Sequence, residues 1–151
     1  MAASAWEMFD VAKRHIGANT VSLSATAGFN MTLHSQGASA NLSDNTLTSW
    51  GSIGSEITAA NKYAAGGLSM SGTGWTVGAS AHQYKFVHTS VVFSASGGAW
   101  TSVRYAVIMF STGATEGYPL CYAALSTVGF SVADGNTLTI IPNASGVFTL
   151  A

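Results

Sequence analysis

Short runs of strand-forming residues, most of them separated by Gly or Pro, fill the chain from Asn19 onward. The closing stretch DGNTLTIIPNASGVFTLA shows the pattern, with a turn before each of its two strand-like runs, 137–141 and 147–150. Several strands at short spacing with turn signals are typical of a β-sandwich or barrel. The sequence therefore predicts an all-β fold, an antiparallel β-sandwich or a jelly-roll-like barrel.

The pattern assigns most of the chain to strands and leaves two long loops. The loops are expected at 35–45 and 61–67. The predicted strands cover 20–26, 29–34, 50–58, 68–77, 84–94, 100–111, 120–126, 130–133, 137–141 and 147–150. The first two are expected to form a hairpin around Ala27-Gly28, and Pro142 is expected at an edge or a bulge, because proline cannot donate to a ladder.

The run 103–110 is apolar on both faces, with Arg104 as the exception at one end. An edge strand with one wet face alternates apolar and polar residues, whereas a strand covered on both faces does not. This run is therefore predicted to be a central strand, covered by a second sheet, by a helix or by a neighbouring subunit.

Residues 1–17 predict a short amphipathic helix in front of the β-sandwich, which covers 18–151; we expect a single domain overall. Ser4 and Glu7 have the spacing of a capping box, and Gly17 is a natural C-cap. The acidic residues come first in this segment and the basic residues last, as the helix dipole favours.

Charge is scarce: only 7% of the residues are charged, against about 25% in an ordinary soluble domain, although the hydrophobic fraction is 48%. Five Lys and Arg residues, scattered along a chain of net charge -1, argue against a nucleic-acid-binding surface. The apolar run 105–110 is far shorter than the roughly 20 residues of a membrane span.

The scarcity of charge predicts that much of the surface is covered in an assembly, because interfaces are depleted in Lys and Glu. The alternative is a monomer with a surface rich in Ser and Thr. The N-terminal stretch MAASAWEMFD lacks the basic start and apolar core of a signal peptide, so we expect the chain to be made and kept in a cytoplasm, or released by lysis.

No residue pattern predicts catalysis, a cofactor or a metal, and the chain is interpreted as having no enzymatic activity. Cys121 is expected to be a small buried hydrophobe, and a single cysteine excludes an internal disulfide framework. His82 and His88 lack the spacing of a metal motif. Glu56 and Glu116 could form a glycosidase pair, but no feature of the sequence favours it.

Tryptophans leave two interpretations open. Trp50, Trp75 or Trp100 could form an exposed platform on which sugar rings stack, as in a carbohydrate-binding module. Alternatively, these rings belong to the core or to a subunit interface.

Four segments resemble those of small virion proteins of tailed bacteriophages. The C-terminal stretch DGNTLTIIPNASGVFTL carries the most specific similarity, and three further segments agree with it. They are WEMFDVAKRHIG, SEITAANKYAAGGLSM and SGGAWTSVRYAVIMF, which together span most of the chain. The middle stretch LSMSGTGWTVGASAHQYKFVHTSVVF departs from the pattern, which leaves the binding surface of this chain undefined.

The resemblance implies a capsid decoration (cement) protein, found in the virion, made in the host bacterial cytoplasm and without catalytic residues to carry over. Its implied partners are the major capsid protein and further copies of itself, as a homotrimer. A neck, tail or fibre component of the virion is an alternative. We expect the partner contacts at the helix and at two apolar turns, through Trp6, Phe9, Lys13, Trp75 and Trp100.

Overall fold

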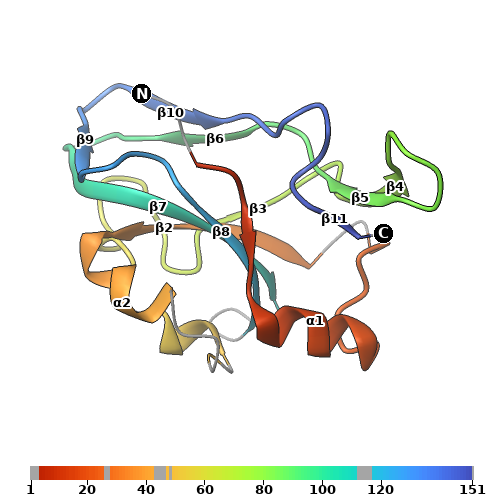
Figure 1. The fold of residues 1–151 in the computed structure, drawn as a ribbon. Coiled ribbons are helices and arrows are strands. Elements are labelled where there is room, and N and C mark those ends of the chain that lie inside the picture. Colours follow the sequence, from red (N-terminus) through yellow and green to blue (C-terminus); the bar gives the residue numbers. More distant parts are fainter. Residues whose placement is uncertain (1–3, 26–27, 43–46, 48, 112–116, 151) are drawn as a thin grey trace.

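Three layers of secondary structure make up the protein in the computed structural model, which describes residues 4–25, 28–42, 47, 49–111 and 117–150. In Figure 1 a main sheet lies between two small sheets on one side and the helical segments on the other. The prediction of an all-β, sandwich-like fold of antiparallel sheets with a short helix near the N-terminus is confirmed.

The main sheet has the strand order β1-β8-β7-β2-β3, and β9 pairs with β7 beside this path. All of these pairings are antiparallel. Its strands are β1 (Glu7–Met8), β2 (Phe29–Ser35), β3 (Leu68–Ser69), β7 (Trp100–Ser111), β8 (Gly117–Ala124) and β9 (Phe130–Val132).

Two small antiparallel sheets cover one face of the main sheet (Figure 1). Aromatic rings join the layers: the ring centroid of Phe29 in β2 lies 4.9 Å from that of Phe86 in β5, and within the main sheet it lies 5.1 Å from that of Phe110. One sheet pairs β6 (Val91–Ser94) with β10 (Thr137–Ile140), and the other joins β4 (Gly74–Val77), β5 (Tyr84–Val87) and β11 (Thr149–Leu150).

Strand β7 is the centre of the main sheet, as its two-sided apolar pattern predicts. It pairs with β2 on one side and β8 on the other, and the side chains of Val107 and Ile108, which point to opposite faces, are both fully buried. The small sheets cover one of these faces and the helical segments the other (Figure 1). Burial on both faces removes the need for polar residues along the strand.

The N-terminal helix α1 (Asp10–Gly17) is shorter than the predicted helix over residues 1–17, and its N-cap is Phe9, not Ser4. The segment before it runs along the edge of β8 instead. The backbone N–H of Ser4 donates to the carbonyl of Ala124, and the Ser4 hydroxyl accepts from the Ala124 N–H. The unpaired edge of β8 gives these residues backbone partners that a first helical turn lacks.

Several predicted strands are wrong or divided. The described part of 20–26 contains turns rather than a strand, although Val21 and Leu23 are buried, and Thr26 and Ala27 lie outside the described residues. Two runs are divided: 68–77 forms β3 and β4, and 84–94 forms β5 and β6 in different sheets. Local β-propensity does not determine where a strand is interrupted or which sheet each part joins.

Helical turns replace a predicted strand and part of a predicted loop. The run 50–58 forms the 3-10 helix η2 (Trp50–Ser52) and a single β-bridge between Glu56 and His34. The loop predicted at 35–45 contains the 3-10 helix η1 (Gln36–Ala38) and the helix α2 (Ser39–Leu42); its last residues, 43–45, lie outside the described part. Within the described ranges, no helix has the length and apolar character needed to cross a membrane.

Candidate functional site

The side of the sandwich next to β2 is closed by a polar clamp, which we define as His34, Glu56, Tyr63 and Gly66. One carboxylate oxygen of Glu56 accepts from the Tyr63 hydroxyl at 2.7 Å and from the Gly66 N–H at 2.9 Å. The Tyr63 oxygen in turn accepts from the N–H of Leu33 in β2 at 3.0 Å. The Glu, Tyr and Gly-Gly pattern of this segment therefore has a structural role, because it fixes the loop against the sheet.

His34 in this clamp is buried and neutral. Its Nδ1 lies 2.8 Å from the Gly54 carbonyl, which can only accept, so Nδ1 carries the proton. Its Nε2 then accepts from the Thr32 hydroxyl at 2.9 Å. Burial lowers the pKa of His34 to about 4, against the opposing effect of the Gly54 hydrogen bond.

The two acidic groups of the clamp also respond to burial. Burial raises the pKa of Glu56, although the hydrogen bonds from Tyr63 and Gly66 act in the opposite direction. Burial, together with the hydrogen bond to Glu56, raises the pKa of Tyr63. None of these three side chains, His34, Glu56 and Tyr63, lines the apolar groove on the opposite side of the sandwich.

Trp100, one of the predicted partner contacts, belongs to the closed side as well. It is 4% exposed, and its indole N–H donates to the carbonyls of Ala60 and Asn61 at 3.3 and 3.1 Å. The amide of Asn61 donates to the Ala99 carbonyl at 3.0 Å, so the Gly-Gly-Ala-Trp segment and the Asn-Lys-Tyr segment hold each other in place.

The turn at Asp134-Gly135-Asn136 positions β10 on β6. Ala95 accepts from the Gly135 N–H and donates to the Asn136 carbonyl, which is the arrangement of a bulge that begins with a left-handed glycine; Gly135 has a φ of 78°. The Asp134 carboxylate accepts from the Gly97 N–H at 2.9 Å. The most specific segment of the phage resemblance thus sets the register of β10.

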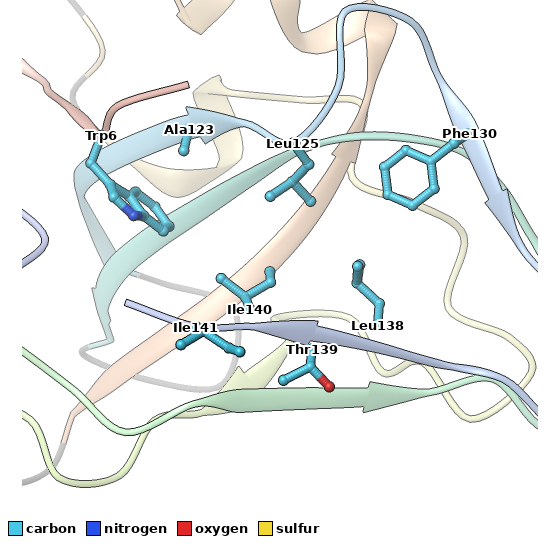
Figure 2. A pocket seen from close by; sticks show the side chains of 8 residues that line it. All are labelled: Trp6, Ala123, Leu125, Phe130, Leu138, Thr139, Ile140 and Ile141. Carbon is cyan, nitrogen blue, oxygen red and sulfur yellow. The ribbon is translucent and has the colours of Figure 1, made fainter. Parts of the chain in front are cut away.

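The opposite side of the sandwich is open and forms an apolar groove between β8 and β10. Figure 2 shows Trp6 and Leu125 on one wall and Ile140 on the other. The space has a volume of about 430 Å³, and a second space of about 580 Å³ adjoins it, with Trp6 and Ile141 lining both. The first space is lined by Trp6, Ala123, Leu125, Phe130, Leu138, Thr139, Ile140 and Ile141.

None of the side chains that line the two spaces is charged. The second space adds small and polar residues, namely Ser4, Ala5, Asn143, Ser145, Gly146 and Val147. Ile141 stands at the junction and is 72% exposed. An exposed apolar groove of this kind is typical of a surface that binds a protein partner or a ligand. We call the two spaces together the β10 groove.

A second apolar surface lies at the end of the sheet formed by β4, β5 and β11. Trp75 and Tyr84 stack with their ring centroids 6.1 Å apart and their planes 14° from parallel. Val77 and Leu150 pair with Tyr84 from the two neighbouring strands and share its face. All three extend beyond the core and remain exposed.

The structure separates the five predicted contact residues. Trp6 is half-buried in the β10 groove, Lys13 is exposed and forms an ion pair with Asp10 at 2.7 Å, and Trp75 is half-buried in the second apolar surface. Phe9 is 2% exposed and contacts Tyr122, so its ring, like that of Trp100, is a core side chain and is not accessible to a partner. The expected contacts therefore do not form one site.

Sequence reasoning missed most of the β10 groove. Leu125, Phe130 and Ile141 read as ordinary strand and turn residues, and only the fold brings them to Trp6. One feature of the sequence does indicate the groove: the run 137–141 has no charge and is followed by Pro142. Proline suits an edge strand, and the run lacks the charged side chains that often prevent another strand from pairing with such an edge.

Groups with possible chemistry are buried or dispersed in the described part of the chain. Cys121 is fully buried, as predicted, and burial raises the pKa of its thiol well above the ordinary value. Among the described residues, no three His, Cys, Asp or Glu side chains come together as metal ligands. The carboxylate pair considered above cannot be placed, since Glu116 lies outside the described residues.

No protein-family model, no curated protein and no solved structure matches this chain.

Proposed function

We propose that this chain is a structural protein of a tailed-bacteriophage virion, which decorates and stabilises the capsid by binding the major capsid protein. The observation that carries the proposal is the β10 groove, a large apolar surface without a charged lining residue. The proposal includes synthesis in the host bacterial cytoplasm and incorporation into the virion, and it assigns the protein no catalytic role.

Binding of this kind needs apolar surface and few charges, because each Å² of apolar surface removed from water contributes about 25 cal/mol. A modest free energy per subunit, repeated over a closed symmetric shell, stabilises the whole shell. Further exposed apolar side chains are available for the same purpose, among them Val77, Val92 and Val128.

Self-association, as a homotrimer, is part of the proposal. Val77, Tyr84 and Leu150 form a continuous extension of a core face beyond the edge of the molecule. A second copy that covered these side chains would bury apolar surface that the free chain leaves in water.

The test is the number of copies of this chain in purified particles, measured by quantitative mass spectrometry against the major capsid protein. About one copy per capsid subunit is the ratio expected of a protein that covers the shell. A handful of copies per particle would assign the chain to the neck, tail or fibre. A chain that stays monomeric when concentrated and does not bind shells of the major capsid protein would overturn the proposal.

A carbohydrate-binding module is the second candidate, and the stacked pair of Trp75 and Tyr84 favours it. Aromatic rings of this kind can lie against the apolar face of a sugar, and Tyr84 is 47% exposed. Trp100 is buried and cannot form such a platform. Quenching of tryptophan fluorescence by members of a glycan panel, abolished by Trp75→Ala and retained by Trp50→Ala, would establish this activity.

A further inference from the structure

The outer edge of β10 has free backbone groups. The bulge at Gly135 and Asn136 places Ala95 in a hydrogen-bonded position, so the alternation of an antiparallel ladder makes Phe93 and Leu138 the next hydrogen-bonded pair. Thr137 and Thr139 lie between these positions, and their N–H and C=O groups point away from β6. Among the described residues, neither group of Thr139 has a hydrogen-bond partner on that outer edge.

The free edge of β10 carries no charge. The run 137–141 contains no charged residue, and Pro142 lies beyond the end of the strand. The other edge of the same two-stranded sheet differs, because the exposed Lys62 lines a pocket together with Val92 of β6. A lysine at an edge discourages the addition of another strand, whereas an uncharged edge permits it.

The β10 groove lies directly beside this free edge, because Thr139 and Ile140 of β10, together with the following Ile141, line the groove (Figure 2). A strand added to β10 would therefore extend over the groove. Alternate side chains of that strand would point toward Trp6 and Leu125, which form the opposite wall. Backbone hydrogen bonds to an edge and side-chain pockets beside it are the two components of recognition by strand addition.

We propose that the edge of β10 and the β10 groove bind an extended, uncharged segment of a protein partner, which adds to β10 as a new edge strand. The absence of charge from the groove lining determines the chemistry of the segment, because a charged side chain buried there would find no opposite charge. This inference rests on the proposed function only for the identity of the partner, which would be the major capsid protein.

The test uses the full chain and a library of random nine-residue peptides. Thr139→Pro removes the outward N–H of β10 and leaves the ladder to β6 intact. Val92→Pro is the matched control, since Val92 faces Thr139 in a non-hydrogen-bonded pair and its N–H points to the opposite edge. We expect selected peptides to be uncharged with alternating apolar residues, and to bind the wild type and Val92→Pro equally.

Thr139→Pro should bind the selected peptides about tenfold more weakly, the effect of one lost hydrogen bond whose partner stays buried. Hydrogen exchange should show that the Thr139 amide becomes protected in the complex. Equal binding by Thr139→Pro, peptides that leave this amide unprotected, or a library that yields no binder would overturn the inference.

A second pair of variants tests binding in the β10 groove if Thr139→Pro does not fold. Ile141→Lys places a charge at the exposed junction of the two spaces of the groove and should weaken peptide binding by a similar factor, whereas Val92→Lys should not. Binding to shells of the major capsid protein distinguishes the strand-addition proposal from the proposed capsid function. Shells that bind wild type and Thr139→Pro equally would overturn the strand addition alone. Peptides that protect Thr139 while shells do not bind would overturn the capsid function alone.

Discussion

The two sides of this sandwich differ in whether the backbone at the side of a sheet is covered or free. Beside β2, the clamp residues Glu56 and Tyr63 hold a loop against the sheet through hydrogen bonds, and Trp100 anchors the same loop. Beside β10, the edge is left free and an apolar groove adjoins it. We call these the closed side and the open side.

The difference separates stability from binding within one small domain. Buried polar groups on the closed side must keep their partners, so substitutions there should cost folding free energy. Exposed apolar groups on the open side contribute little to the isolated fold, so substitutions there should change association instead. The following variants test this contrast, from the largest expected effect to the smallest.

Gly67→Ala should unfold the protein or reduce its stability by about 4 kcal/mol or more. A Cβ at this position would lie 2.0 Å from the Met31 carbonyl oxygen of β2, and Gly67 has a φ of +71°. Gly97→Ala is the control: its φ is +87°, but no atom lies within 4 Å of the added Cβ, so only the backbone strain of about 1 kcal/mol remains. Urea denaturation measures both, and equal losses would show that the clamp loop is not packed tightly on β2.

Acidification should destabilise the closed side through His34. Because its folded pKa of about 4 lies below the ordinary value of 6.5, the unfolded chain binds the proton first. The contribution of His34 to the free energy of unfolding, about 3 kcal/mol, is therefore fully present above pH 6.5 and is lost as the pH falls toward 4. The lowered pKa values of His15 and His88 act in the same direction, and the raised pKa of Glu56 acts in the opposite one.

The comparison of variants isolates the contribution of His34. His34→Asn should be less stable at pH 7 but should lose much less stability on acidification than the wild type does. His82→Asn, at an exposed position, should follow the wild type. Denaturant midpoints at pH 7, 6, 5 and 4 measure the effect, and parallel pH profiles for all three proteins would contradict it.

Two tyrosine-to-phenylalanine variants compare the same hydrogen bond in two surroundings. Tyr63 and Tyr122 each donate to a glutamate at 2.7 Å, but the bond from Tyr63 to Glu56 is part-buried and the bond from Tyr122 to Glu7 is exposed. Tyr63→Phe also leaves the buried Leu33 N–H without its partner and should cost about 2 kcal/mol. Tyr122→Phe should cost less than about 1 kcal/mol. Thermal unfolding of both variants measures the difference, and equal costs would show that burial does not set the contribution of this hydrogen bond.

Ile141→Lys should change the free energy of unfolding by less than about 0.5 kcal/mol, because the side chain is 72% exposed. Its effect should appear in binding: the variant should bind the selected peptides more weakly than the wild type does. Peptide titration and denaturant unfolding of the same samples measure the two properties. A large loss of stability would show that Ile141 supports the fold and that the open side is not reserved for binding.

The sequence by itself determined the elements whose signal is local or two-sided. The apolar run at 103–110 predicted a central strand because burial on both faces leaves no polar alternation, and β7 has that position. Turn residues at Asp134 to Asn136 predicted the start of β10, because a left-handed glycine and an acceptor side chain are local requirements. The antiparallel, sandwich-like class followed from the spacing of such strands and turns.

Only the tertiary structure decided which backbone groups found partners. Ser4 and Glu7 have the spacing of a capping box, yet this segment pairs with the edge of β8. Local spacing cannot reveal that pairing with a distant strand competes with a helical turn. The clamp joins Leu33 to Tyr63 across 30 positions, and the groove brings Trp6 to Ile141. Both depend on contacts between distant segments, so the same residue types could close one side and leave the other open.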